Sequence, residues 1–183
     1  MIIKEERIGN QRLILGDCLQ VMPTLGRFDA CLTDPPYGIK RDKGMGLGGH
    51  GKGGVKRNGK RYEGAWDQDR PTAKAFAAIL SVSDFHVIWG GQFFADLLPP
   101  NGKWLWWDKC QTMPSYGDGE MAWTDLPGDA PKKFTLAMNA IVARGLSGLH
   151  PTQKPLALME WCLGFLPDAK TILDPFMGSG TTL

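Results

Sequence analysis

Short apolar runs that end at glycine, proline or an acidic residue recur along this chain. Runs bounded in this way are typical of buried β-strands. Because segments with helical spacing follow several of these runs, the pattern indicates βα units and an α/β fold. The predicted strands are residues 12–15, 28–33, 85–89, 104–109, 120–124, 134–143 and 171–173.

Apolar residues at helical spacing follow several of these runs. Pro155 suits the first position of a helix, and Leu156, Met159, Leu163 and Leu166 would give that helix its apolar face. Each strand and the helix after it would form one βα unit. The predicted helices are residues 18–25, 73–80, 92–98 and 155 to about 167.

Composition limits the class of protein. With 183 residues, 43% of them hydrophobic, the chain is long enough for one domain, residues 1–183, with a sizeable core. The 21 basic and 19 acidic residues nearly balance, so overall charge alone does not indicate nucleic acid. No apolar run is long enough to span a membrane, and the four cysteines form no CxxC pair. We expect a cytoplasmic protein with reduced cysteines and no metal site.

The stretch from Thr171 to Leu183 is the first candidate site. A strand reaches Asp174, passes through Pro175 and Phe176, and enters a turn formed by Gly178, Ser179 and Gly180. Ser179, Thr181 and Thr182 suit the first turn of a helix, whose N–H groups and hydroxyls would face an anion. Asp174 could accept from an ammonium, so a zwitterionic ligand would be held at both poles. The alternative is a packed βα turn that uses glycine for close approach.

A second candidate site follows the strand at residues 28–33. Pro35 and Pro36 remove two N–H donors and leave carbonyl acceptors at the strand end, between Asp34 and Tyr37. This set suits an exocyclic amino group, because Asp34 and the Pro35 carbonyl accept its two hydrogens while Tyr37 stacks on its ring. The alternative is a proline-rich turn with a buried tyrosine.

Asp17 ends another strand, and Cys18 follows it. The carboxyl end of a strand is where α/β folds place ligand contacts, which makes both residues candidates. A simple N-cap for the following helix is the equally weighted alternative.

Together these motifs resemble those of the DNA methyltransferases that methylate adenine N6 or cytosine N4. The resemblance rests on Asp34-Pro35-Pro36-Tyr37, on His150-Pro151-Thr152-Gln153-Lys154-Pro155 and on Asp174-Pro175-Phe176-Met177-Gly178-Ser179-Gly180, in the order of the permuted beta class. It implies a Rossmann-like sheet with helices on both faces, S-adenosylmethionine (SAM) as cofactor, and a setting such as restriction–modification in a prokaryotic or phage-infected cytoplasm.

The resemblance also assigns roles to residues. Asp34, Pro35, Pro36 and Tyr37 would be catalytic. The cofactor would be held by Asp17, Cys18, His150, Thr152, Gln153, Lys154, Asp174, Pro175, Phe176, Gly178, Ser179, Gly180 and Thr181. No metal is implied. The aspartate at position 34 favours adenine over cytosine, since cytosine-N4 enzymes more often carry serine there.

Residues 39–66 form a glycine-rich basic loop. Between Lys40 and Arg61 it holds eight basic residues and one acid, Asp42, so it could contact the phosphates of double-stranded DNA. A solvated loop without a role is the alternative. The predicted DNA contacts are Lys40, Arg41, Lys43, Lys52, Lys56, Arg57, Lys60 and Arg61. The resemblance places target recognition in residues 103–147.

Members of that family continue past the glycine turn with the rest of a helix and a further strand, which would lie between strands 171–173 and 12–15. This sequence ends at Leu183. We therefore expect a fragment, a truncated product, or a chain completed by a homodimer partner or a second fragment. A catalytically silent DNA-binding remnant, and an enzyme that methylates RNA or protein amino groups, are the alternative functions.

Overall fold

The computed structural model describes residues 2–39, 67, 69–112, 117–137, 153–178 and 180–182. Its main feature is a six-stranded mixed sheet with the order β7-β5-β6-β4-β3-β8. Strand β3 is parallel to β4 and β8, whereas β6 is antiparallel to β4 and β5. The strands are β3 (Phe28–Thr33), β4 (Ser83–Trp89), β5 (Trp104–Asp108), β6 (Gly119–Thr124), β7 (Lys132–Thr135) and β8 (Ile172–Leu173).

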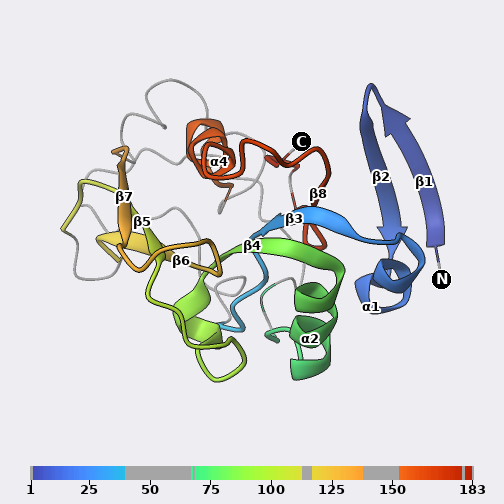
Figure 1. Cartoon of the computed structure of the whole chain (residues 1–183), viewed down its shortest axis with the longest axis horizontal. Coiled ribbons are helices and arrows are strands. Elements are labelled where there is room, and N and C mark those ends of the chain that lie inside the picture. Colours follow the sequence, from blue (N-terminus) through green and yellow to red (C-terminus); the bar gives the residue numbers. More distant parts are fainter. Residues whose placement is uncertain are drawn as a thin grey trace, which may run out of the picture.

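Helices cover both faces of this sheet, as predicted. Helix α4 (Leu156–Leu163) lies on one face and α2 (Ala73–Val82) on the other (Figure 1). Alternate residues of a strand point to opposite faces. Accordingly, Leu32 packs in the cluster that contains α4, and its neighbour Cys31 packs in the cluster that contains α2.

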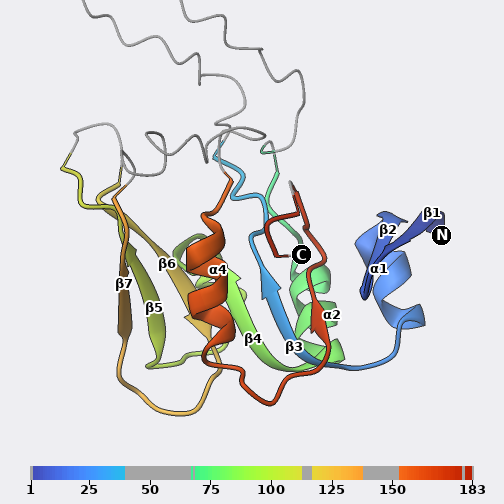
Figure 2. The same ribbon diagram turned by 90° about the horizontal axis from the view of Figure 1, so that it is seen from above.

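The predicted strand at residues 12–15 forms, but not in the main sheet. It is β2 (Gln11–Gly16), which pairs antiparallel with β1 (Ile2–Ile8) in a separate two-stranded sheet. This hairpin stands beside the six-stranded sheet (Figure 2). Our expectation that strand 12–15 belongs to the main sheet is wrong for the described residues, because a turn at Gly9 and Asn10 folds Ile2–Ile8 back onto it.

Helix α4 buries a different face from the predicted one. Leu158, Met159 and Cys162 are buried, whereas Leu156 is 62% exposed and Leu163 36% exposed. Pro155 is the N-cap rather than the first helical residue, and the helix ends at Leu163 instead of near residue 167. The segment is apolar on nearly every side, so periodicity could not identify the face that meets the sheet.

Two further element boundaries differ from the prediction. The segment 92–98 forms the 3₁₀ helix η3 (Gly91–Phe94) followed by turns, rather than one α-helix. Strand β7 begins at Lys132 instead of Phe134 and ends at Thr135, and residues 138–143 of the predicted strand lie outside the described residues. Helix α1 (Cys18–Val21) and the 3₁₀ helix η1 (Met22–Thr24) occupy the segment that we predicted as helix 18–25.

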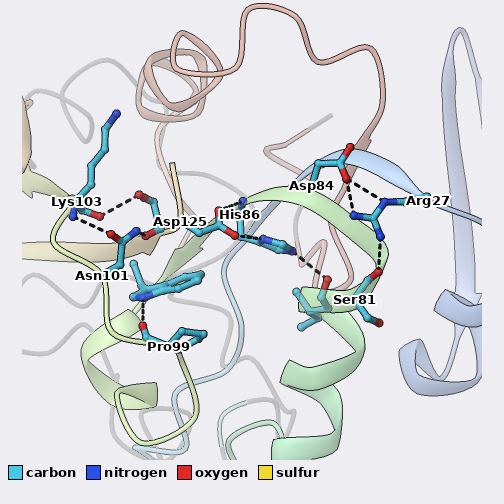
Figure 3. Close-up of polar contacts among 11 residues, drawn as sticks. Arg27, Ser81, Asp84, His86, Pro99, Asn101, Lys103 and Asp125 are labelled. Carbon is cyan, nitrogen blue, oxygen red and sulfur yellow. Dashed lines mark hydrogen bonds and ion pairs between the residues drawn. The ribbon is translucent and has the colours of Figure 1, made fainter. Parts of the chain in front are cut away.

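His86 and several tryptophans serve the core. The His86 ring lies within 2.6 Å of Asp125 (Nδ1 to Oδ2) and 3.1 Å of Ile79 (Nε2 to the carbonyl), so both nitrogens have partners (Figure 3). Trp123 is buried and donates to the Pro99 carbonyl. The prediction of a core histidine is confirmed. No helix in the part of the chain that the structure describes is long and apolar enough to cross a membrane.

Candidate active site

Three strands bring their carboxyl ends to one edge of the sheet. β4, β3 and β8 are neighbours and mutually parallel, and their arrowheads point the same way (Figure 2). Asp34 follows β3, Gly90 follows β4 and Asp174 follows β8. Two motifs separated by about 140 residues therefore meet at the edge where α/β sheets bind ligands.

Asp34 is half-buried, and both of its carboxylate oxygens accept hydrogen bonds. Oδ1 accepts from the Tyr37 hydroxyl at 2.6 Å, and Oδ2 accepts from Lys154 Nζ at 2.6 Å. The turn itself is fixed by Asp67, whose Oδ1 accepts from the backbone N–H groups of Tyr37 and Gly38. The orientation of the Asp34 carboxylate is thus determined by its neighbours.

The Tyr37 ring is enclosed by the end of β4. It stacks on Phe93 with the ring centroids 4.9 Å apart, and a Cβ atom on Gly90 would lie only 2.1 Å from Tyr37 Cε1. Burial raises the pKa of the Tyr37 hydroxyl well above its usual value. The phenol is therefore neutral and donates to Asp34.

Lys154 is 5% exposed and contacts the Asp34–Tyr37 turn, a motif to which we had not assigned it. Its Nζ lies 2.6 Å from Asp34 Oδ2, 3.2 Å from the Tyr37 hydroxyl and 3.0 Å from Glu120 Oε2. We predicted that Lys154 would line the cofactor pocket. Burial alone would lower the pKa of Lys154, but Asp34 and Glu120 outweigh it and raise the pKa well above its usual value.

Glu120, Lys109 and Asp67 belong to this cluster and were missed in the sequence. Lys109 Nζ donates to Glu120 Oε1. Burial opposes ionisation of Glu120, but Lys154 and Lys109 outweigh it and hold its pKa at about 2. One signal was visible in the sequence: Glu120 lies at the start of an apolar strand, where a lone acid needs a partner.

Asp174 is held in a turn by three donors. Oδ1 accepts from the Thr33 hydroxyl at 2.7 Å and from the Phe176 N–H at 3.1 Å, while Oδ2 accepts from the Thr182 hydroxyl at 2.7 Å. Burial raises the pKa of the Asp174 carboxyl above its usual value. The described residues 180–182 form turns, so the predicted first turn of a helix is wrong for them.

The remaining predicted residues are dispersed. Asp17 caps α1, and its carboxylate accepts from the Leu19 N–H and Gln20 Nε2, which fits the N-cap alternative. Gln153 is half-buried ahead of α4, and Cys18 is half-buried in α1. The predicted residues outside the described part of the chain are His150, Thr152, Ser179, Lys40, Arg41, Lys43, Lys52, Lys56, Arg57, Lys60 and Arg61.

An open hollow lies at the end of the β5–β6 hairpin. Its volume is about 360 Å³, and it lies in the region predicted to recognise the target. The lining residues are Trp106, Asp108, Cys110, Gln111, Thr112 and Asp118. Among the residues that the structure describes, no group of three or more His, Cys, Asp or Glu side chains could hold a metal ion.

Comparison with known proteins finds a family model that is similar to the C-terminal part of the chain. Residues 98–183, which include Glu120, Lys154 and Asp174, match the model of the N6/N4 methyltransferase family described as DNA methylase. The match begins at residue 98 and therefore does not include the Asp34–Tyr37 turn. That turn contacts the matched region through the hydrogen bond from Lys154 to Asp34. No curated protein matches this chain.

Solved structures extend the comparison to most of the chain. The crystal structure of the M1.HpyAVI–SAM complex is 22% identical with a TM-score of 0.51, and the match covers 91% of this chain and 82% of that one. A crystal structure of M1.HpyAVI is also 22% identical, covering 91% and 81%, with a TM-score of 0.48. The first match confirms the predicted Rossmann-like methyltransferase fold.

Proposed function

We propose that this chain is a SAM-dependent DNA methyltransferase that acts on the exocyclic amino group of a base, with adenine N6 favoured and cytosine N4 the second choice. One observation carries the proposal. Asp34 and Asp174, the acids of the two motifs, follow strands β3 and β8, which pair in parallel through Ala30–Ile172 and Cys31–Leu173. The proposed acceptor of the amine and the proposed cofactor contacts would therefore lie at one edge of the sheet.

The residues around Asp174 suit the zwitterionic methionine end of SAM. Asp174 offers a carboxylate whose pKa is raised by burial, and an ammonium beside it would favour the charged form. Phe176 is half-buried next to it, and Gly178 and Gly180 have positive φ. These residues would hold the cofactor, which supplies an electrophilic methyl group on a sulfonium when bound.

The residues of the Asp34 turn would act on the acceptor base. An exocyclic amine is a weak nucleophile because its lone pair is delocalised into the ring. Asp34 and the Pro35 carbonyl would accept its two hydrogens and localise electron density on nitrogen. Such positioned acceptors lower a barrier mainly through orientation and preorganised charge. The base must first leave the duplex, at a cost of a few kcal/mol.

The partner in this proposal is double-stranded DNA. The eight basic residues of the loop at 40–61, which lie outside the described residues, would contact phosphates. Adenine is favoured by the aspartate at position 34, in line with the family resemblance. The match of residues 98–183 to a DNA methylase model supports DNA over RNA or protein as the acceptor.

A single experiment tests the reaction and the base together. The purified chain is incubated with SAM and long unmethylated DNA, the DNA is digested to nucleosides, and the products are identified by mass. We expect N6-methyl-2′-deoxyadenosine as the product. N4-methyl-2′-deoxycytidine would correct the base only, whereas binding of DNA and SAM without any methylated nucleoside would overturn the proposed function.

Two variants separate the roles of the acids. Asp34→Ala should abolish transfer while the Kd for SAM, measured by calorimetry, stays within about threefold, because Asp34 contacts the base. Asp174→Asn keeps one acceptor oxygen, which can still serve Thr33, but removes the charge, so it should weaken SAM binding roughly 10-fold or more. Equal transfer by wild type and Asp34→Ala would contradict the assignment.

A further inference from the structure

We propose that Lys154 is a positioning residue for the Asp34 carboxylate, anchored from the far side by Glu120, and is not a contact of the cofactor. This inference rests on the proposed function and assigns a role in the same site. It takes Lys154 out of the predicted cofactor set and places it behind the residue that meets the acceptor amine.

Oxygens of this cluster occupy the surroundings of the Lys154 ammonium. Nζ donates to Asp34 Oδ2 at 2.6 Å and to the Tyr37 hydroxyl at 3.2 Å. Glu120 Oε2 lies 3.0 Å from Nζ in an ion pair, without the geometry of a hydrogen bond. A cofactor carboxylate would have to displace one of them, and the side chain of Lys154 is only 4% exposed.

Asp34, by contrast, keeps acceptor capacity. Each carboxylate oxygen has two lone-pair sites. Tyr37 takes one on Oδ1 and Lys154 takes one on Oδ2, which fixes the carboxylate plane and leaves one site on each oxygen for an incoming amine. A carboxylate held at both oxygens has no orientational freedom to lose when the substrate binds.

The anchor comes from a distant strand. Glu120 lies on β6, and the order β6-β4-β3 puts the end of β4 between it and Asp34. Lys154 bridges that gap, with its Nζ 6.0 Å from the centroid of Trp89 in β4. Glu120 also binds Lys109, so two ammonium groups balance two carboxylates. Charge balance allows Lys154 to remain buried and ionised.

The test compares kcat with cofactor affinity. Lys154→Met should lower kcat for DNA methylation roughly 10²-fold, as expected when a catalytic group is misplaced by about 1 Å. The Kd for SAM and the KM for DNA should stay within about threefold. Lys154→Arg keeps a buried cation and should recover part of the lost kcat. The matched control is Lys4→Met, which removes an exposed lysine that pairs with Glu6 and should change nothing.

Three results would overturn the inference. A 10-fold or larger rise in the Kd for SAM, with kcat unchanged at saturating cofactor, would make Lys154 a cofactor contact. Full kcat in Lys154→Met would show that the ion pair is structural only. If Lys154→Met does not fold, Glu120→Gln serves instead; it should lower kcat roughly 10-fold at unchanged SAM affinity, and full kcat would be equally decisive.

Failure of the proposed function is distinguishable from failure of this inference. Wild-type protein that transfers no methyl group to DNA overturns both. Active wild-type protein whose kcat is unaffected by Lys154→Met overturns only the inference about Lys154.

Discussion

Gly90 determines how closely the Tyr37 ring approaches the end of β4. Its φ of 72° lies in the left-handed region, and the Tyr37 ring occupies the space that a Cβ atom would need. The ring in turn aims its hydroxyl at Asp34 Oδ1. A glycine that carries no functional group therefore controls the position of the proposed catalytic acid.

Gly90→Ala should disturb both folding and activity. The left-handed backbone alone costs about 1–2 kcal/mol, and displacement of the Tyr37 ring adds about 1–3 kcal/mol. Gly26→Ala is the matched control, because Gly26 has a φ of 84° with nothing within 4 Å of the added atom. Urea unfolding should show a larger loss for Gly90→Ala, and only that variant should lose methyl transfer. Equal losses in both variants would show that the ring moves freely.

Among the secondary-structure elements, β8 depends on a side chain from its neighbour. Asp29 of β3 accepts from the backbone N–H groups of Lys170 and Thr171 and from the Thr171 hydroxyl, all through Oδ2. These donors, the Lys170 N–H foremost, hold the pKa of Asp29 below its usual value. Since β8 has only two residues, this capping contact fixes where the strand begins and so where Asp174 lies.

Asp29→Ala should loosen β8 selectively. Hydrogen exchange at Ile172 and Leu173 should accelerate, and SAM binding should weaken because Asp174 follows directly. Asp84→Ala provides the control, because Asp84 pairs with Arg27 (Figure 3) and lies on β4, which β3 separates from β8. Exchange at β8 that is unchanged in Asp29→Ala, or equally fast in both variants, would contradict the role of Asp29.

The elements differ in how far the sequence could predict them. The strand at Phe28–Thr33 is predicted residue for residue, because a mostly apolar run is followed directly by Asp34 and two prolines. The buried face of α4 and the pairing of β2 with β1 are not, since both depend on which neighbour is present. Local pattern identifies an element, whereas packing decides its orientation.

At the scale of the whole molecule, the site is a charge-balanced cluster built from segments far apart in sequence. Asp34 follows β3, Lys109 follows β5, Glu120 lies on β6 and Lys154 precedes α4. The motifs predicted Asp34 and Lys154 as site residues, but no spacing relates them to Glu120 or Lys109. Only the sheet order brings the four together, and for that reason the ion pairs could not be predicted from the sequence.

Because of Glu120, the free energy of unfolding should fall as the solution becomes acidic. Its pKa of about 2 lies below the ordinary value of 4.5, so the stabilisation is present above pH 4.5 and is lost as pH falls toward 2. Each proton taken up contributes up to about 1.4 kcal/mol per pH unit. Removing one partner of such a pair costs about 3–5 kcal/mol at neutral pH.

We therefore expect the free energies of unfolding of wild type and Glu120→Gln to approach each other as the pH falls. The difference in free energy of unfolding between wild type and variant, from urea titrations, should be largest near pH 6 and shrink toward pH 3, because acid protonates the same carboxylate in wild type. Glu6→Gln, at an exposed pair with Lys4, should follow wild type throughout. Parallel curves for wild type and Glu120→Gln would mean that Glu120 is not stabilised as a carboxylate. The ammonium groups of Lys154 and Lys109 would then need another counter-charge.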